Sequence, residues 1–204
     1  MTEAGMQSST FSPETEKSMR NIFRSFNKFM LLLFRLGLGS YVNGTRWGGW
    51  IMVLSQVGRK SGLLRRTPLN YALVDGDVYC LAGFGAQADW YRNILANPQV
   101  EVWLVEGRWA GIAEDVSDHP QRLDLLRKVL IASGFASYAA GIDPLKLDDE
   151  DLDALTQNYR LVRIRRQEAR TGPGGPGDLA WVWPLATMIL LPLALKKSKP
   201  RANK

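Results

Sequence analysis

A short basic loop is the part of the sequence in which residue types and spacing best fit binding chemistry. Residues 58–62 begin and end with glycine and enclose Arg59, Lys60 and Ser61. Glycines at both ends let successive backbone N–H groups converge on an anion. Arg65 follows closely and can turn a guanidinium toward the same point. The loop predicts a site for a phosphate or a carboxylate-rich ligand, although the same residues would also suit an exposed turn.

A second group of residues could receive a flat ring. Gly83 and Gly85 flank Phe84 and permit close approach of the backbone to a planar molecule. Trp90 and Asn93 follow on a short predicted helix and offer an aromatic wall and one amide. Core packing is the simpler interpretation of Trp90, whereas an amide beside aromatic residues needs a hydrogen-bond partner. Loop and helix together predict one pocket for a large anionic ligand.

The sequence has one cysteine and one histidine, and these low counts exclude several classes of catalytic site. Cys80 is the only cysteine, so an internal disulfide and a multi-cysteine metal site are excluded. Its apolar surroundings predict a buried, inert thiol. His119 is the only histidine and precedes a proline at a predicted helix start, which favours a capping or surface role. Neither a Ser-His-Asp triad nor a multi-histidine metal site can be built, and no metal site is expected.

The net charge of +6 is concentrated at the C-terminal end. Five of the 26 Lys and Arg residues follow Leu195, with no acidic residue among them. The preceding part therefore carries 21 Lys and Arg against 20 Asp and Glu, and is nearly neutral. A basic tail on a neutral body fits an anionic membrane surface better than a nucleic-acid-binding face. We expect no nucleic-acid partner.

The apolar pattern predicts about six strands with helices inserted between them. The predicted strands are residues 50–57, 65–74, 78–82, 99–105, 108–116 and 159–165. Predicted helices are residues 16–36, 88–96, 118–132 and 148–157, with an irregular connection over 134–147. Pro68 predicts an edge position or a bulge in the second strand. The order of elements favours a small mixed barrel and gives no alternating βαβ series.

The two ends of the chain carry apolar segments. Residues 1–16 are polar and predict a disordered lead, and the helix that follows has an apolar face and regularly spaced cations. Packing on the core and insertion into a membrane interface are both open for this helix. Residues 171–177 are a Gly/Pro linker, and residues 180–195 contain no charge. As a helix they would span about 24 Å, which is shorter than a bilayer core of about 30 Å. We predict that this segment lies in the inner leaflet as an apolar arm and is held there by the basic tail. Packing of the arm on the domain or on a dimer partner is the alternative.

The loop, the hairpin after it and the following helix together resemble the deazaflavin-dependent nitroreductase family. The matching residues are Gly58-Arg59-Lys60-Ser61-Gly62, then Arg65 and Pro68-Leu69, then Trp90-Tyr91-x-Asn93-x-x-Ala96-Asn97-Pro98. The resemblance covers roughly residues 45–165. It implies an α+β fold with a split β-barrel of mostly antiparallel strands and the cofactor F420, which bears a phosphate and a glutamate tail. The implied reaction passes a hydride from C5 of reduced F420 to a quinone or nitro acceptor.

The resemblance also implies roles for individual residues. Arg59, Lys60 and Ser61 would hold the phosphate and glutamate portion, and Arg65 and Asn93 would contact the phosphate. The backbone of Ala82, Gly83 and Phe84 would meet the deazaflavin ring. The cofactor-binding set is Arg59, Lys60, Ser61, Gly62, Arg65, Pro68, Ala82, Gly83, Phe84, Trp90 and Asn93.

At one position on the acceptor side of the site, this sequence differs from the family that it resembles. Well-known members carry a serine where this chain has Gly83, and the segment up to Trp90 is about three residues shorter. The hydroxyl that would orient the acceptor or donate a proton is therefore missing. On chemical grounds alone, Tyr138 and Tyr159 are candidates for lining the acceptor side and for protonating the reduced oxygen.

The sequence thus predicts an F420H2-dependent reductase acting on a quinone-like or nitroaromatic acceptor near the membrane. A non-catalytic module that binds a flavin, haem or lipid is the alternative. An FMN-dependent oxidase is a third, weaker hypothesis, because the basic loop suits a longer anionic tail than FMN has. We expect a cytoplasmic protein, peripheral on the inner face of the membrane, and the resemblance alone favours a homodimer. The expected divisions are 1–16 lead, 17–44 amphipathic helix and linker, 45–168 split-barrel domain, 169–178 linker and 179–204 apolar segment with basic tail.

Overall fold

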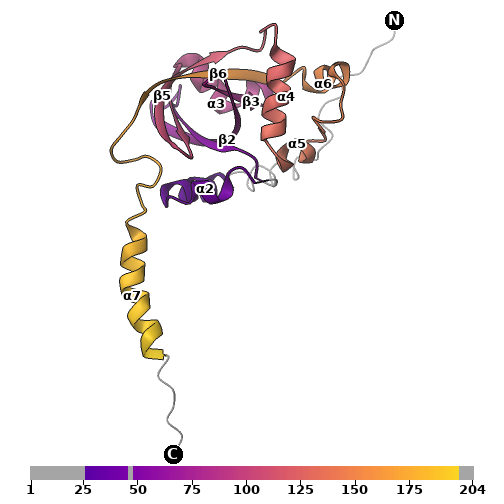
Figure 1. Cartoon of the computed structure of the whole chain (residues 1–204). Helices are drawn as coiled ribbons and strands as arrows, with labels where there is room; N and C mark the ends of the chain where they lie inside the picture. Colours follow the sequence, from indigo (N-terminus) through magenta and orange to yellow (C-terminus); the bar gives the residue numbers. More distant parts are fainter. Residues whose placement is uncertain (1–25, 46–47, 198–204) are drawn as a thin grey trace, which may run out of the picture.

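The chain folds around a closed barrel of six antiparallel strands (Figure 1). The computed structural model describes residues 26–45 and 48–197. Around the barrel the strands follow the order β1-β2-β3-β6-β5-β4. The strands are β1 (Ile51–Val57), β2 (Leu64–Val74), β3 (Asp77–Ala82), β4 (Gln99–Leu104), β5 (Gly107–Asp115) and β6 (Arg160–Ala169). The predicted α+β split β-barrel is confirmed.

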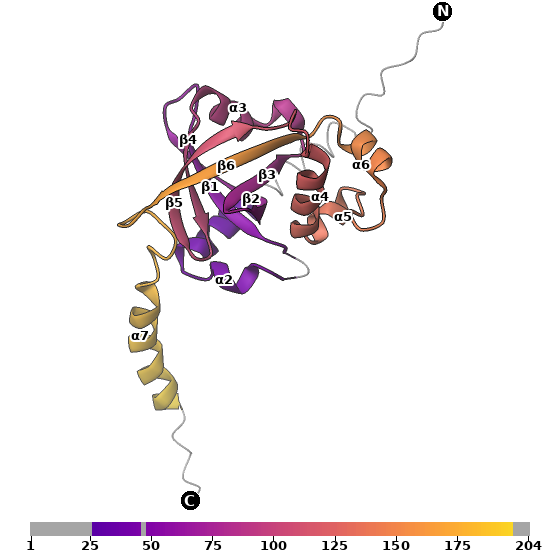
Figure 2. The same cartoon turned by 45° about the horizontal axis from the view of Figure 1, so that its top comes forward.

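Helices fill two of the connections between strands, from β3 to β4 and from β5 to β6, as predicted. Figures 1 and 2 show α4, α5 and α6 gathered on one side of the barrel, and α7 projecting away from it. The helices are α2 (Gly39–Val42), the single 3-10 turn η1 (Gly85–Gln87), α3 (Asp89–Ala96), α4 (Arg122–Ala132), α5 (Phe135–Ala139), α6 (Asp149–Thr156) and α7 (Val182–Lys197). Residues 26–35 are also helical, and we call them the N-terminal helix; the predicted lead and the start of that helix lie outside the described residues.

Three local predictions are refined by the structure. The helix predicted from residue 118 begins at Arg122, because His119 first closes a turn in which its Nδ1 accepts from the Gln121 backbone N–H. Part of the connection predicted to be irregular forms the short helix α5. Pro68 lies in the stretch of β2 that pairs only with β1, so its missing N–H leaves no ladder bond unmade.

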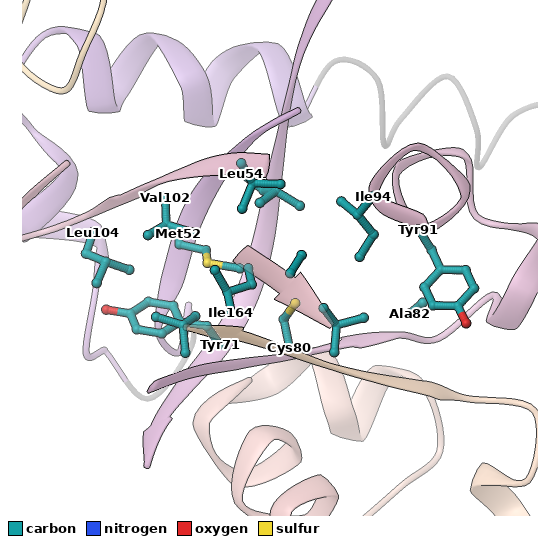
Figure 3. Packing of buried hydrophobic residues seen from close by; sticks show 14 residues of the cluster. Met52, Leu54, Tyr71, Cys80, Ala82, Tyr91, Ile94, Val102, Leu104 and Ile164 are labelled. Carbon is teal, nitrogen blue, oxygen red and sulfur yellow. The ribbon is translucent and has the colours of Figure 1, made fainter. Parts of the chain in front are cut away.

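Alternation along β1 explains why this strand is buried on both faces. Met52 and Leu54 point into the barrel, whereas Ile51 and Val53 point outward and are covered by the N-terminal helix. Figure 3 shows the inner cluster, with Tyr91 and Ile94 of α3 at one end and Tyr71 and Leu104 at the other. Helix α3 therefore closes one end of the barrel. Its position is fixed by the core.

The N-terminal helix packs on the barrel by one face and leaves an apolar face in solvent. Met30 and Phe34 are buried against Val53 and Trp103. On the other face Phe29 is 57% exposed, and Phe26 and Leu32 are exposed as well. Core packing is thus the correct interpretation of one face. The exposed face is the part for which a membrane interface stays a prediction.

The Gly/Pro linker, residues 171–177, is held against the barrel, and we call it the strap. Arg108 donates to the carbonyl oxygens of Thr171 and Pro173 at 2.8 and 3.2 Å. Beyond the strap, Arg35 forms a two-pronged ion pair with Asp178, with an Nη2–Oδ2 distance of 2.9 Å. The base of α7 is therefore fastened to the end of the N-terminal helix.

Helix α7 exposes apolar side chains in every direction. Met188 to Leu191 are four consecutive exposed residues, and successive residues of an α-helix point about 100° apart. The exposed apolar residues of this segment are Trp181, Trp183, Leu185, Met188, Ile189, Leu190, Leu191, Leu193 and Leu195. Among the described residues, no helix combines the length and apolar character needed to cross a bilayer.

A buried tyrosine fastens α3 to the opposite wall. The hydroxyl of Tyr91 donates to Asp115 Oδ2, while Asp115 Oδ1 accepts from the Ser117 backbone N–H at 2.9 Å. Burial alone would raise the pKa of Asp115, but the hydrogen bonds from Ser117 and Tyr91 outweigh it and hold the pKa below its usual value. Burial, followed by the bond to Asp115, raises the pKa of Tyr91 to about 12.

Replacing Tyr91 by phenylalanine tests this connection. We expect the free energy of unfolding to fall by about 1 kcal/mol at neutral pH, because Asp115 is partly exposed and loses one charged hydrogen bond. The folded-state pKa of Asp115 is depressed, so its contribution is complete above about pH 4 and is lost as the pH falls through the folded-state value. Urea denaturation at neutral pH and at about pH 3 should therefore show the loss shrinking in acid. Tyr41→Phe, at a 79% exposed position, is the control; an equal loss at both pH values would contradict the prediction.

Candidate functional site

The basic loop forms a compact turn between β1 and β2. The Gly58 N–H donates to the Leu63 carbonyl at 2.9 Å, and the Gly62 N–H donates to the Gly58 carbonyl at 2.8 Å. Gly62 has φ +65°, a conformation that glycine adopts without strain. The Ser61 N–H also turns back to Gly58. The expectation that the loop's N–H groups converge on an anion is therefore wrong for these three, because the turn itself uses them.

Arg59 joins the loop to α3. Its Nη1 donates to Asn93 Oδ1 at 2.9 Å, and its backbone N–H donates to the same oxygen at 3.2 Å. Its Nη2 donates to Asp89 Oδ1 at 2.9 Å, and this hydrogen bond lowers the pKa of Asp89. The Arg59 guanidinium therefore positions α3, and both of its terminal nitrogens already donate hydrogen bonds within the protein. Asn93 is 6% exposed, and its Nδ2 is the end of the amide that a ligand could use.

A groove of about 860 Å³ runs beside the loop, and we call it the cationic groove. Its walls come from the ends of β1 and β2, the loop, α3 and the N-terminal helix. It is lined by Leu31, Gln56, Gly58, Arg59, Lys60, Ser61, Leu64, Arg65, Arg66, Thr67, Asp89, Trp90 and Asn93. Lys60 and Arg65 are exposed, and the Arg65 guanidinium contacts Ser61 Oγ at 3.4 Å. The groove is thus strongly cationic, with both charges directed at solvent.

The structure brings together six of the predicted cofactor-binding residues. These are Arg59, Lys60, Ser61, Arg65, Trp90 and Asn93, which all line the cationic groove. Gly62 shapes the loop behind it, and Pro68 pairs with Val53 inside the barrel wall. Trp90 also packs against the core cluster, which confirms the core-packing interpretation, and its contact with a ring stays a prediction.

The remaining predicted residues lie outside the lining of the groove. Ala82 is buried in the barrel at the end of β3, and Gly83 and exposed Phe84 follow it. Tyr159 faces residues 82–85 after β3, which we call the corner. A Cβ added at Gly83 would lie 3.7 Å from the Tyr159 ring. Tyr138 is on α5, beside α4, and is exposed (Figure 2). Burial raises the pKa of Tyr159.

Glycine at position 83 is not required by packing. The 3.7 Å contact is an ordinary van der Waals distance, so a small side chain would fit. Gly85 differs, because it has φ +60° and an added Cβ would lie 2.4 Å from the Asn158 carbonyl oxygen. The corner is therefore built around Gly85, and Gly83 leaves room beside Tyr159.

Sequence reasoning missed several residues of the groove. Gln56 and Arg65 are register partners on β1 and β2, and Arg66 and Thr67 follow on β2. Strand pairing was the signal that could have found them, since residues opposite a known site residue share its surroundings. Asp89 lies four residues before Asn93, one helical turn away on the same face.

The other reactive residues lie apart from the groove. Cys80 is buried in the core cluster, and burial raises the pKa of its thiol to about 12, as expected for an inert cysteine. Within the described ranges, no three His, Cys, Asp or Glu side chains gather in a way that could hold a metal ion. The groove is thus the main concentration of binding groups on this part of the chain.

Solved structures with a similar fold come from several bacteria. A Bacteroides thetaiotaomicron protein provisionally described as a 5-nitroimidazole antibiotic resistance protein is 11% identical, with 59% of this chain and 75% of that chain covered and a TM-score of 0.45. A conserved hypothetical protein of Mycobacterium tuberculosis is 22% identical, with 65% and 80% covered and a TM-score of 0.44. A haem-binding protein of Mycobacterium smegmatis is 14% identical, with 73% and 59% covered and a TM-score of 0.43. Similarities at this level carry no conclusion about function.

The family comparison is more specific. The sequence profile of the F420H(2)-dependent quinone reductases matches residues 37–147, which is more than half of the 204 residues. The matched segment includes the basic loop, β1 to β5 and α3, and therefore nearly all of the cationic groove. The chain belongs to the family of F420H(2)-dependent quinone reductases.

Proposed function

We propose that the protein is an F420H2-dependent reductase that passes a hydride from the reduced deazaflavin to a quinone-like or nitroaromatic acceptor near a membrane. Membership of the family implies F420 as the cofactor. The observation that carries the proposal is the cationic groove, in which Lys60 and Arg65 are exposed beside the Ser61 hydroxyl and the Asn93 amide.

The residues of the groove fit the anionic part of F420. Phosphate and carboxylate groups are bound by charge-assisted hydrogen bonds from Lys and Arg, and Arg65 offers a two-pronged fork. Because Arg59 is engaged with Asp89 and Asn93, we assign it to holding the site together rather than to direct phosphate contact. This changes the role expected for Arg59, while Lys60, Ser61, Arg65 and Asn93 remain the proposed contacts.

The reduced deazaflavin supplies the hydride, and the protein has to orient the acceptor and keep water out. Leu31 and Trp90 contribute apolar surface to the lining of the groove. The corner at Gly83, where Tyr159 stands opposite the backbone, is the proposed location of the ring and of a proton donor. Burial raises the pKa of Tyr159, so its hydroxyl carries its proton at neutral pH but is a weaker acid than an exposed tyrosine.

Membrane association accounts for the exposed apolar segments. A helix that is apolar on every side has no polar face to keep toward water, so lipid suits it better than a folded protein surface. Trp181 and Trp183 lie at its base and Lys196 and Lys197 at its end, which are residue types favoured at the bilayer interface. At about 24 Å, α7 is too short to span a bilayer core of about 30 Å, so with interfacial residue types at both ends it would lie along one leaflet. We therefore propose a peripheral position on the inner face of the cell membrane, where a lipid-soluble acceptor is found.

The cofactor site is tested with the double variant Lys60→Ala/Arg65→Ala. We expect the affinity for F420 to fall by about a hundredfold, because two charge-assisted contacts are removed. Fluorescence titration with F420, and with FMN as competitor, measures it. Lys128→Ala/Lys146→Ala removes the same charge at sites outside the groove and should leave the affinity unchanged. Equal F420 affinity in all three proteins, or a preference for FMN, would overturn the proposed site.

The proton donor is tested with Tyr159→Phe. If this hydroxyl protonates the reduced acceptor, kcat should fall by about a hundredfold, while the Kd for F420 stays as in the wild type. Tyr138→Phe removes the second candidate hydroxyl, from the exposed surface of α5, and should have little effect. Steady-state rates with a soluble quinone decide between them. A large loss with Tyr138→Phe alone would assign the role to the other tyrosine.

Membrane association is tested with Leu190→Glu/Leu193→Glu in α7. Each buried charge costs about 3 kcal/mol in a bilayer, so co-sedimentation of the protein with anionic vesicles should be lost. Leu145→Glu, at a 70% exposed site in the connection between α5 and α6, is the matched control. A different result would mean that α7 packs on a second copy of the chain. In that case the wild-type protein would not co-sediment with vesicles, and the double variant would have a smaller molecular mass in solution than the wild type.

A further inference from the structure

Arg160 is a half-buried arginine whose guanidinium donates no hydrogen bond and joins no ion pair within the part of the chain that the structure describes. Every other half-buried arginine in residues 26–45 and 48–197 donates at least one hydrogen bond. The Arg160 guanidinium is also accessible, because none of its nitrogens is among the fully buried polar atoms that lack a partner. A guanidinium is always charged in proteins and carries five N–H donors. Arg160 therefore has donors to offer to a bound molecule.

The register of the sheet places this side chain on the inner face of the barrel. Arg160 is the direct partner of Ala82 across β3 and β6, and opposite residues of an antiparallel pair project to the same face. Ala82 belongs to the inner core cluster, as does Val162, two residues beyond Arg160. Figure 3 shows Ala82 at the same end of the barrel as Tyr91 of α3. Arg160 therefore lies at the end that α3 closes, beside the first residue of the corner.

Tyr159 and Arg160 flank the corner from opposite faces. Side chains alternate along a strand, so Tyr159, just before β6, lies on the outer side, where its ring would be 3.7 Å from a Cβ added at Gly83. Arg160 lies on the inner side. A molecule bound at the corner would therefore have a hydroxyl on one side and a permanent positive charge on the other.

Asp115 is the acidic group at this end of the barrel, and its oxygens are already used by other donors. Oδ2 accepts from the Tyr91 hydroxyl, and Oδ1 accepts from the backbone N–H and the hydroxyl of Ser117. Burial raises the pKa of Asp115, the hydrogen bonds from Ser117 and Tyr91 lower it, and the charge of Arg160 lowers it further through space. Because the two opposite charges offset each other at a distance, the guanidinium would act mainly on an oxygen that it touches.

We infer that Arg160 is a catalytic residue whose guanidinium contacts the acceptor oxygen on which negative charge develops. The inference rests on the proposed function, in which the reduced deazaflavin supplies a hydride to a quinone-like molecule at the corner. Gain of a hydride converts a quinone into a hydroquinone monoanion, and one proton, proposed to come from Tyr159, completes the hydroquinone. A fixed donor beside a developing oxyanion accelerates such reactions by about 10²–10³-fold. Arg160 would thus make a contact with the acceptor that Gly83, which has no hydroxyl, cannot make.

Arg160→Gln tests the role in the reaction. The kcat with a soluble quinone should fall by about a hundredfold, while the Kd for F420 stays as in the wild type, because the lost contact is with the acceptor. Arg160→Lys keeps the charge but not the planar fork, so it should recover part of kcat. Arg165→Gln is the matched control, because Arg165 is 54% exposed on the outer face of the same strand and pairs with Glu114. It should keep the wild-type kcat.

A second measurement detects the oxygen contact without turnover. 4-Nitrophenolate resembles the anionic reduced acceptor, and 4-nitroaniline has nearly the same shape without the negative charge. In protein loaded with oxidised F420, absorbance titration should show that the wild type binds the phenolate about tenfold more tightly than the aniline. Arg160→Gln should bind the two compounds equally, whereas Arg160→Lys should keep most of the preference and Arg165→Gln all of it. A purely structural role for Arg160 would not produce this difference.

The outcomes separate this inference from the proposed function. If the wild type binds F420 and reduces quinones, but Arg160→Gln keeps kcat and the phenolate preference, the role of Arg160 is wrong and the proposed function stands. If Arg160→Gln lowers kcat, the affinity for F420 and the urea midpoint of unfolding together, Arg160 holds the end of the barrel in place and the inference also fails.

If the wild type does not bind F420, the proposed function fails, and titration of the cofactor-free protein with 4-nitrophenolate then tests the contact by itself. Binding that is abolished in Arg160→Gln and kept in Arg165→Gln would support an oxyanion contact at Arg160. Absence of binding would exclude it.

Discussion

The hydrogen bonds of Arg59 are the contacts on which the arrangement of the site depends. One side chain joins the basic loop, which follows β1, to α3, which follows β3. Asn93 is almost fully buried, and without the Arg59 side chain its Oδ1 would keep only the backbone N–H of residue 59 as a donor. The cationic groove exists between these two elements. Its shape is therefore maintained by a cation that the ligand itself does not need to contact.

The barrel supplies the rigid frame for this junction. Strand β1 is buried on both faces, so it holds the loop at one end while its outer side chains seat the N-terminal helix. Tyr91, one residue from Trp90, fastens α3 to Asp115 on the far wall. The loop and the helix are thus each tied to the core, and Arg59 joins them to each other. This arrangement suits hydride transfer, in which the geometry of two bound molecules matters more than any reactive side chain.

Sequence patterns predicted the strands closely because alternation and turn residues are local signals. The six predicted residues that line the groove, three of them in the loop, were also within reach from residue types and spacing. What the pattern could not show was how each group is used. The inward turn of the loop's N–H groups and the engagement of Arg59 with Asp89 depend on tertiary contacts. Arg66 was missed because only the pairing of β1 with β2 places it beside the groove.

The distribution of charge links the groove to the apolar arm. Residues before the basic tail are nearly neutral overall, so the positive potential of the groove is local rather than a property of the whole surface. The tail adds its own charge from Lys196 onward, and the strap separates α7 from the barrel in sequence. An anionic membrane would attract the tail, and an anionic cofactor would be drawn to the groove. Arg66 touches both the groove and the strap that leads to the arm, so one side chain links the groove to the segment that carries α7.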